Sequence, residues 1–133
     1  ILKAPSGCLI YTSSQNQSKV NALQALGATV IDMPNAAGKV DLAAMLRDLA
    51  QRGTNELHVE AGFKLNGSFI REGLVDEFLF YQAPKLLGTG AMGIANFGPL
   101  DALTQGVDLE FHDITRLGPD LRIIARVQGR DQF

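Results

Sequence analysis

Short apolar runs alternate with segments of helical periodicity along the first part of the chain. An apolar run bounded by glycine, proline or serine is typical of a buried strand, whereas apolar residues spaced three and four apart indicate one face of a helix. This strand–helix–strand alternation predicts parallel pairing with right-handed crossovers. We predict strands at residues 9–12, 29–33, 56–60 and 77–83, and helices at residues 17–26, 42–52 and 63–72. Asp41 is the expected N-cap of the second helix, and Gly73 is the expected left-handed residue after the third.

The last part of the chain has a different pattern. Residues 107–115 alternate between apolar and polar side chains, and a second strand-like segment, 121–127, follows the turn signal Gly118-Pro119-Asp120. Two strands joined by a short turn form an antiparallel hairpin. The strand at 77–83 is apolar on both faces, which is typical of an interior strand. The predicted fold class is therefore α/β, with a mixed, mainly parallel sheet that ends in an antiparallel C-terminal hairpin.

Composition and charge exclude several classes of function. The 133 residues are 46% hydrophobic, which is enough for one compact domain with a core. The net charge of −2 and the pI of about 5.6 provide no basic surface for nucleic acid or an anionic membrane. No apolar stretch approaches the roughly 20 residues that span a bilayer. Composition therefore provides no support for a protein that binds nucleic acid or spans a membrane.

Residue types that bind metals or act as nucleophiles are sparse. Cys8 is the single cysteine, which excludes an internal disulfide framework and fits a reducing cytoplasm. His58 and His112 lack the spacing of metal ligands, so we predict no metal site. We interpret His58 as a structural histidine and Cys8 as a buried free thiol. Because the chain begins at Ile1 and leads directly towards a strand, we expect it to be the downstream piece of a longer protein.

The segment from Val59 to Phe69 is the most informative part of the chain. A predicted strand ends in Glu60, a glycine turn follows at Gly62, and a helix then begins with unpaired backbone amides. Ligands of open α/β proteins bind at the carboxyl edge of the sheet, and a helix start attracts phosphate through its amides and partial positive charge. The segment is therefore typical of a nucleotide-cofactor enzyme. Glu60 is either a surface carboxylate or an acceptor for a ribose hydroxyl or a pyrimidine ring.

Two further residues of this segment bear on the site. Gly67 lies inside the predicted helix, where a glycine costs about 1 kcal/mol relative to alanine. We expect its missing side chain to allow the close approach of a ligand or a neighbouring strand. Lys64 either adds a positive charge near a phosphate or points into solvent.

Residues 88–93 match the G-x-G-x-x-G pattern of dinucleotide-binding folds. That pattern requires a helix to begin within the glycines. Asn96, Gly98 and Pro99 follow instead, so no helix of useful length can form here. We therefore predict a flexible loop that lines a pocket at most.

Several blocks of the chain together resemble the C-terminal part of the pyrimidine reductase of riboflavin biosynthesis, which is the reductase half of a bifunctional deaminase/reductase. They occur in the family's order between about Glu56 and Val127, and they are specific as a set. Upstream of them only the strand–helix layout matches. The blocks are Val59-Glu60-Ala61-Gly62, Leu65-Asn66-Gly67-Ser68-Phe69, Gly73-Leu74-Val75-Asp76-Glu77, Ala83-Pro84-Lys85-Leu86-Leu87-Gly88 and Gly118-Pro119-Asp120-Leu121.

The resemblance implies a dihydrofolate-reductase-like fold, a three-layer sandwich, of which residues 1–133 are the C-terminal portion of a single pyrimidine reductase domain. It implies NADPH-dependent reduction of the ribosyl group of 5-amino-6-(5-phosphoribosylamino)uracil to the ribityl product by a homodimer. Glu60 would contact the substrate. The residues implied to bind the NADPH phosphates are Gly62, Phe63, Lys64, Leu65, Asn66, Gly67 and Ser68. No catalytic residue is assigned, because hydride transfer is the chemistry of the cofactor itself.

The chain also departs from the family. Ala61 replaces a frequent glycine, and Phe63 and Lys64 stand where the family often has proline or a small residue followed by a hydroxyl residue. The upstream reductase segment and the deaminase with its zinc signature are not among these residues, so we predict no zinc and no deamination, and we expect the isolated chain to lack part of its pocket. Two alternatives remain open: a non-catalytic nucleotide-binding or assembly module of the same fold, and a dihydrofolate-reductase-like reductase with another substrate.

Overall fold

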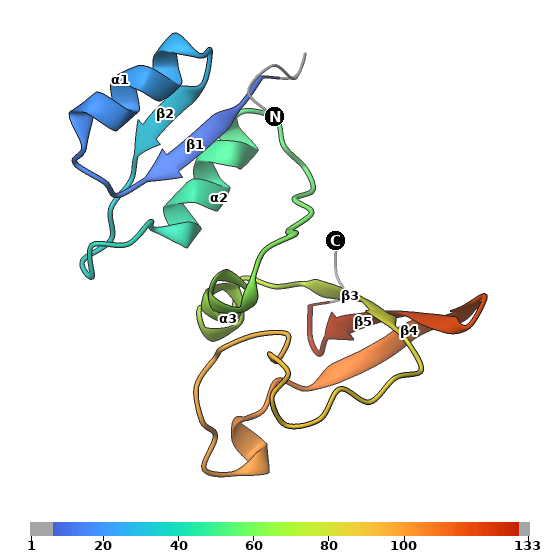
Figure 1. Ribbon diagram of the computed structural model, residues 1–133. Helices are drawn as coiled ribbons and strands as arrows, with labels where there is room; N and C mark the ends of the chain where they lie inside the picture. The colour runs from blue at the N-terminus through green and yellow to red at the C-terminus, as the bar shows by residue number, and fades with distance from the viewer. Residues whose placement is uncertain (1–6, 131–133) are drawn as a thin grey trace. The chain divides into compact units, whose positions relative to one another are not determined.

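The computed structural model describes residues 7–130 of the chain (Figure 1). The chain forms two compact units, which divide between Leu57 and His58. Few apolar side chains are buried among the described residues: Ala28 and Leu42 in the first unit, and Phe69 and Ala125 in the second. None of the helices in this part of the chain is long and apolar enough to cross a membrane.

The first unit contains a two-stranded parallel sheet. Its strands, β1 (Leu9–Thr12) and β2 (Thr29–Asp32), are connected by α1 (Gln17–Ala25), and α2 (Leu42–Gln51) follows. These elements lie where the hydrophobic pattern predicts them, within two residues at each end. The predicted parallel pairing of the first two strands is confirmed.

Side-chain caps determine where the helices of the first unit begin. The carboxylate of Asp41 accepts a hydrogen bond from the Ala44 amide at 2.8 Å. The side chain of Asn16 accepts one from the Lys19 amide at 3.0 Å. Each cap satisfies an amide that has no partner within its helix. Asp41 was predicted as a cap, and that prediction is confirmed.

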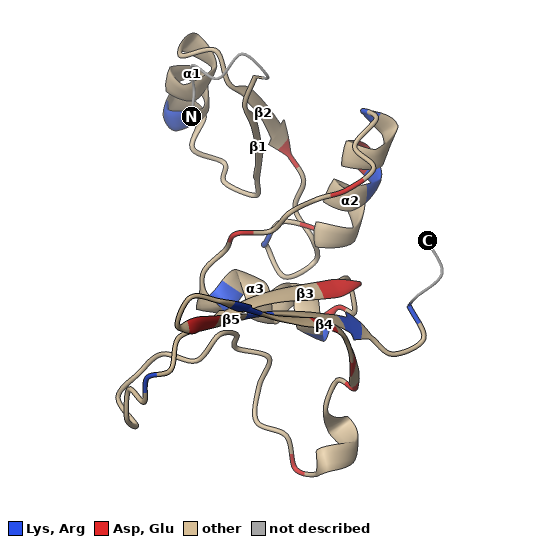
Figure 2. Ribbon diagram, turned by 90° about the vertical axis from the view of Figure 1, so that its right-hand side faces the viewer, with Lys and Arg blue, Asp and Glu red and all other residues tan. Residues whose placement is uncertain are grey.

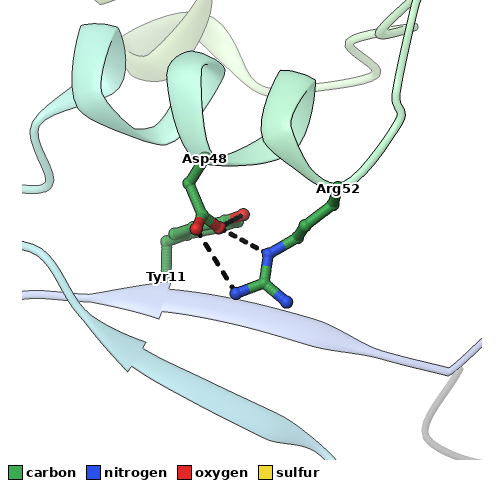
Figure 3. Close-up of polar contacts among 3 residues, drawn as sticks. All are labelled: Tyr11, Asp48 and Arg52. Atoms are coloured by element: carbon green, nitrogen blue, oxygen red, sulfur yellow. Dashed lines mark hydrogen bonds and ion pairs between the residues drawn. The ribbon is translucent and has the colours of Figure 1, made fainter.

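A polar cluster joins α2 to β1 (Figure 3). The Tyr11 hydroxyl donates a hydrogen bond to Asp48 Oδ2 at 2.6 Å, and Arg52 Nε donates to the same oxygen at 2.7 Å. Hydrogen bonds from Arg52 and, to a smaller extent, Tyr11 lower the pKa of Asp48. Burial, followed by the contact with Asp48, raises the pKa of Tyr11. The cluster thus favours the charged form of Asp48 and the neutral form of Tyr11.

We expect Asp48→Asn to destabilise the first unit near neutral pH and to lose this effect in acid. The pKa of Asp48 in the folded state lies below its ordinary value, so the carboxylate stabilises the fold above the ordinary pKa of about 4. That contribution disappears as the pH falls through the lower, folded-state pKa. Urea unfolding at both pH values, followed by circular dichroism, measures the difference. Glu56→Gln, which alters an exposed carboxylate, is the control; an Asp48→Asn variant as stable as wild type near neutral pH contradicts the prediction.

The prediction of a strand at residues 56–60 is wrong. No strand lies between α2 and α3 (Phe63–Arg71). Leu57 and Val59 are 41% and 40% exposed, and no described strand pairs with their segment. A strand requires partners for its backbone groups and a buried face. The apolar alternation at Leu57 and Val59 has neither, so it does not produce a strand here.

The second unit combines α3 with a three-stranded antiparallel sheet in the order β3-β5-β4. The strands are β3 (Glu77–Gln82), β4 (Leu109–Leu117) and β5 (Asp120–Val127), and a short 3₁₀ helix, η1 (Leu103–Gln105), precedes β4. β4 and β5 form the predicted antiparallel hairpin, which is confirmed. A β-bulge between Phe111 and Asp113 interrupts the alternation that the sequence suggested.

Helix α3 packs against one face of this sheet. Its end follows the predicted pattern, because Gly73 adopts a left-handed φ of +63° and the Leu74 amide donates to the Phe69 carbonyl at 2.9 Å. The Phe69 side chain is 5% exposed. Ile70 and Phe78 line one cavity, which places α3 on the face of the sheet that carries Phe78.

The prediction that β3 is an interior strand is wrong for the described residues. β3 pairs only with β5. Phe78 and Phe80 stack at 5.4 Å on one face, whereas Leu79 and Tyr81 on the other face are 41% and 65% exposed. An apolar residue at every position therefore does not establish that both faces are covered.

Ion pairs connect neighbouring strands of this sheet, along which acidic and basic positions are interspersed (Figure 2). Arg126 Nε lies 3.0 Å from Glu77 Oε2, and Arg122 Nη2 lies 2.8 Å from Asp113 Oδ2. Each pair joins β5 to one of its two neighbours. Such partly exposed pairs contribute little stability individually but oppose a shift of the strand register.

The elements confirm an α/β fold with both parallel and antiparallel pairing. These pairings lie in two separate hydrogen-bonded sheets rather than in one mixed sheet. The prediction of a single sheet depended on a strand at residues 56–60, which comes after β2 and before β3 in the sequence. That strand does not form.

Candidate functional site

The start of α3 presents open backbone donors. Gly62 is the N-cap, no side chain caps the helix, and its first turn has no acidic residue. The amides of Leu65 and Asn66 both donate to the Gly62 carbonyl at 3.1 Å. Nothing among residues 7–130 accepts a hydrogen bond from the amides of Gly62, Phe63 and Lys64. Three donors and the positive end of the helix dipole are thus available to an anion.

Glu60 lies two residues before this helix start. Its side chain is 86% exposed, and its Oε1 is 3.4 Å from Nε2 of His58, which is itself 62% exposed. A pair this exposed is weak, so it leaves the carboxylate free to accept hydrogen bonds from a ligand. His58 is therefore a surface neighbour of Glu60 rather than part of a core.

Gly67 is in close contact with the chain itself. The residue is buried, and a Cβ at this position would overlap the backbone of Asn96. The close approach expected at Gly67 is therefore made by the loop that follows β3. A loop backbone thus explains why a glycine is tolerated in the middle of α3.

The remaining predicted cofactor residues divide into two groups. Lys64 and Leu65 are exposed, whereas Phe63, Asn66 and Ser68 are half-buried. The Asn66 side chain donates to the Ile94 carbonyl at 3.1 Å. The Ser68 hydroxyl donates to the Lys64 carbonyl at 3.3 Å and accepts a hydrogen bond from Arg71 at 3.0 Å. The side chains of Asn66 and Ser68 thus form hydrogen bonds within the protein, and Gly67 is packed against the Asn96 backbone.

The loop after β3 contributes residues that sequence reasoning missed. Ile94 and Asn96 contact α3, and Arg71 Nη1 donates to the Asn96 carbonyl at 2.6 Å. The single signal in the sequence was the helix glycine, which indicated a close neighbour without identifying it. As predicted, residues 88–93 form no helix. The G-x-G-x-x-G match is therefore a loop.

Two cavities lie elsewhere on the second unit. One, of about 240 Å³, is lined by Glu110, His112 and Arg126 among others, and the other, of about 200 Å³, lies beside Ile70 and Phe78. Neither contains Glu60 or any residue from Gly62 to Ser68. The candidate site, formed by the helix start and the segment before it, therefore lies outside both cavities.

The chain matches the family described as "RibD C-terminal domain" over residues 2–123. Riboflavin biosynthesis protein RibD of Escherichia coli (strain K12) is 37% identical over 89 residues, which are 67% of this chain and 24% of that protein. A 5-amino-6-(5-phosphoribosylamino)uracil reductase of Buchnera aphidicola is 31% identical over 86 residues, which are 65% of this chain and 42% of that protein. The chain thus spans less than half the length of these relatives.

Two solved structures resemble the chain. RibD of Acinetobacter baumannii has a TM-score of 0.80 and 26% identity, over 96% of this chain and 33% of that chain. A pyrimidine reductase-like protein of Corynebacterium diphtheriae has a TM-score of 0.75 at 18% identity, over 94% of this chain and 52% of that chain, which shows the fold alone. The family match and these structures show that the chain belongs to the RibD C-terminal domain family, with its dihydrofolate-reductase-like fold.

Proposed function

We propose that residues 1–133 are the C-terminal portion of a single pyrimidine reductase domain, which reduces 5-amino-6-(5-phosphoribosylamino)uracil with NADPH in riboflavin biosynthesis. The observation that carries this proposal is the uncapped start of α3, with three open amides that begin two residues after Glu60. The similarity to a Buchnera relative of that name supports the same substrate class. The proposed reaction uses one hydride and one proton to convert the ribosyl group into the ribityl group.

The open amides fit a phosphate of the cofactor. We assign direct contacts to the amides of Gly62, Phe63 and Lys64, since Leu65 and Asn66 use theirs within the helix turn. The exposed Lys64 side chain adds a positive charge beside the same phosphate. Leu65, Asn66, Gly67 and Ser68 then complete the site by shaping α3. When bound, NADPH supplies the hydride, and the protein supplies position and electrostatic field.

Glu60 is proposed to hold the substrate. Its exposed carboxylate lies two residues from the amides assigned to the cofactor. A carboxylate is an acceptor that can bind two donors of a ribose or of a pyrimidine ring. Holding these groups beside the cofactor would align the acceptor carbon with the hydride donor, which is the main contribution a binding residue makes to such a reaction.

The assay that tests the function measures NADPH oxidation by absorbance in the presence of 5-amino-6-(5-phosphoribosylamino)uracil. The protein is the longest native polypeptide that carries this chain. We expect turnover that depends on the pyrimidine ribotide. NADPH binding without turnover would favour the non-catalytic module, and turnover with a different substrate alone would favour another reductase of the same fold.

The reductase is further proposed to act in the cytoplasm as a homodimer. Cys8 is a free thiol, which is half-buried rather than buried as predicted, and a free thiol fits a reducing compartment. β4 pairs only with β5 among the described strands, and Phe111 and Ile114 on β4 are 66% and 55% exposed. An exposed apolar edge strand is suited to association with a second copy. Sedimentation velocity measures the oligomeric state, and a monomer at all concentrations contradicts this proposal.

A further inference from the structure

The segment from Gly93 to Asn96, which we call the strap, is attached to the first turns of α3. The Asn96 amide donates a hydrogen bond to the Phe63 carbonyl at 2.9 Å. The Asn66 side-chain amide donates to the Ile94 carbonyl at 3.1 Å. A loop that follows β3 is thus held against the helix by bonds in both directions.

Arg71 and Gly67 determine where the strap lies. Arg71 Nη1 donates to the Asn96 carbonyl at 2.6 Å, and its Nη2 donates to Ser68 Oγ at 3.0 Å, which orients the guanidinium. The absence of a side chain at Gly67 leaves the space that the Asn96 backbone occupies. The backbone of Asn96 is therefore fixed at its amide, at its carbonyl and along its contact with the helix.

The bond to Phe63 reaches the proposed phosphate site through one peptide group. The Phe63 carbonyl and the Lys64 amide belong to the same planar, trans peptide, so the two groups point in opposite directions. Fixing the carbonyl therefore fixes the direction of the Lys64 N–H. A hydrogen bond accepted by the carbonyl also polarises the peptide and makes its N–H a stronger donor.

We propose that Gly67 and Arg71 are positioning residues for cofactor binding, which act by holding the strap against the Phe63–Lys64 peptide. This inference rests on the proposed function, because it takes the Lys64 amide to be a phosphate ligand. Neither residue needs to contact the cofactor. Each residue fixes the backbone of Asn96, and the hydrogen bond from Asn96 fixes the Phe63–Lys64 peptide, whose amide is proposed to bind the phosphate.

Gly67→Ala and Arg71→Ala test this inference by two different routes. Gly67→Ala adds a methyl group where the Asn96 backbone lies, and because alanine has a higher helix propensity than glycine, it should not weaken the helix itself. Arg71→Ala removes the side-chain donor to the Asn96 carbonyl. In the longest native polypeptide, each variant is expected to raise the Kd for NADPH roughly 10-fold, as for the loss of a hydrogen bond to a charged group. At saturating NADPH, kcat should stay near the wild-type value, since the lost interaction serves binding. Hydrogen exchange of residues 88–98 should increase in both.

Two controls separate positioning from a general loss of structure. Gly90→Ala lies in the same loop, has no positive φ and places its Cβ in open space, so it should bind NADPH like wild type. Arg71→Lys retains a charged donor for the Asn96 carbonyl but not the planar fork that also reaches Ser68 Oγ, so it should restore part of the affinity. Wild-type protein that does not bind NADPH overturns the proposed function. A second outcome overturns the strap inference alone. In it, the wild-type protein binds NADPH, and a Gly67→Ala or Arg71→Ala variant binds it equally well although hydrogen exchange in its strap is faster.

Discussion

Phe69→Ala is expected to lower the free energy of unfolding of the second unit by about 3–5 kcal/mol, the range for deleting a buried aromatic ring. The ring is 5% exposed and is the largest of the few buried side chains among residues 7–130. A loss of this size is a large fraction of the total stability of a typical domain, about 5–15 kcal/mol. Urea denaturation followed by far-ultraviolet circular dichroism measures it.

Leu65→Ala is the matched control for this prediction. Leu65 is on the same helix but is 44% exposed, so we expect its truncation to change stability by less than about 1.5 kcal/mol. A Phe69→Ala variant with the same urea midpoint as the Leu65→Ala variant would show that the Phe69 ring is not the core of this unit.

Glu60→Gln is expected to reduce kcat/KM for the pyrimidine ribotide about 10- to 100-fold, the effect of losing a charged hydrogen-bond partner worth roughly 1.5–3 kcal/mol. The exposed side chain makes only a weak contact with His58, so the substitution should not affect folding. The Kd for NADPH should remain within about two-fold of the wild-type value, because the phosphate contacts are assigned to the amides after Gly62.

Glu56→Gln provides the comparison, because it changes an exposed carboxylate four residues earlier in the chain. It should leave both kcat/KM and the Kd for NADPH unchanged. Equal kinetics for Glu60→Gln and wild type would remove Glu60 from the substrate site. A rise in the Kd for NADPH without a change for the ribotide would place Glu60 beside the cofactor instead.

Local signals in the sequence were sufficient to predict the helices. The caps at Asp41 and Gly62 and the left-handed Gly73 act within one or two turns, so the residues that determine each helix end lie close together in the chain. The β4–β5 hairpin was equally predictable, because its strands are joined by a short turn.

Features that depend on distant residues were not predictable. The apolar alternation of residues 56–60 does not produce a strand, because pairing is a property of two segments. The neighbour of Gly67 lies in a loop far along the chain, and a glycine inside a helix reveals that something approaches without revealing what it is. Nothing in the sequence distinguishes Arg71 from other exposed arginines, because its partner, the Asn96 carbonyl, belongs to a loop 25 residues further along the chain.

The helix start and Glu60 can therefore be proposed as a site from the sequence, whereas the strap that contacts α3 is seen only in the fold. Gly62, Phe63 and Lys64 were predicted as part of a phosphate site, and the structure leaves their amides without acceptors among the described residues. Our central proposal is that these three amides bind a phosphate of the cofactor.

Amide chemical shifts measured by transverse-relaxation-optimised NMR test this proposal most directly. The longest native polypeptide is labelled with ¹⁵N at glycine, phenylalanine and lysine and titrated with NADPH. We predict large shifts of the Gly62, Phe63 and Lys64 amides that saturate together with cofactor binding, and little change at Gly90. Saturable NADPH binding with all three amides unshifted would contradict the proposal.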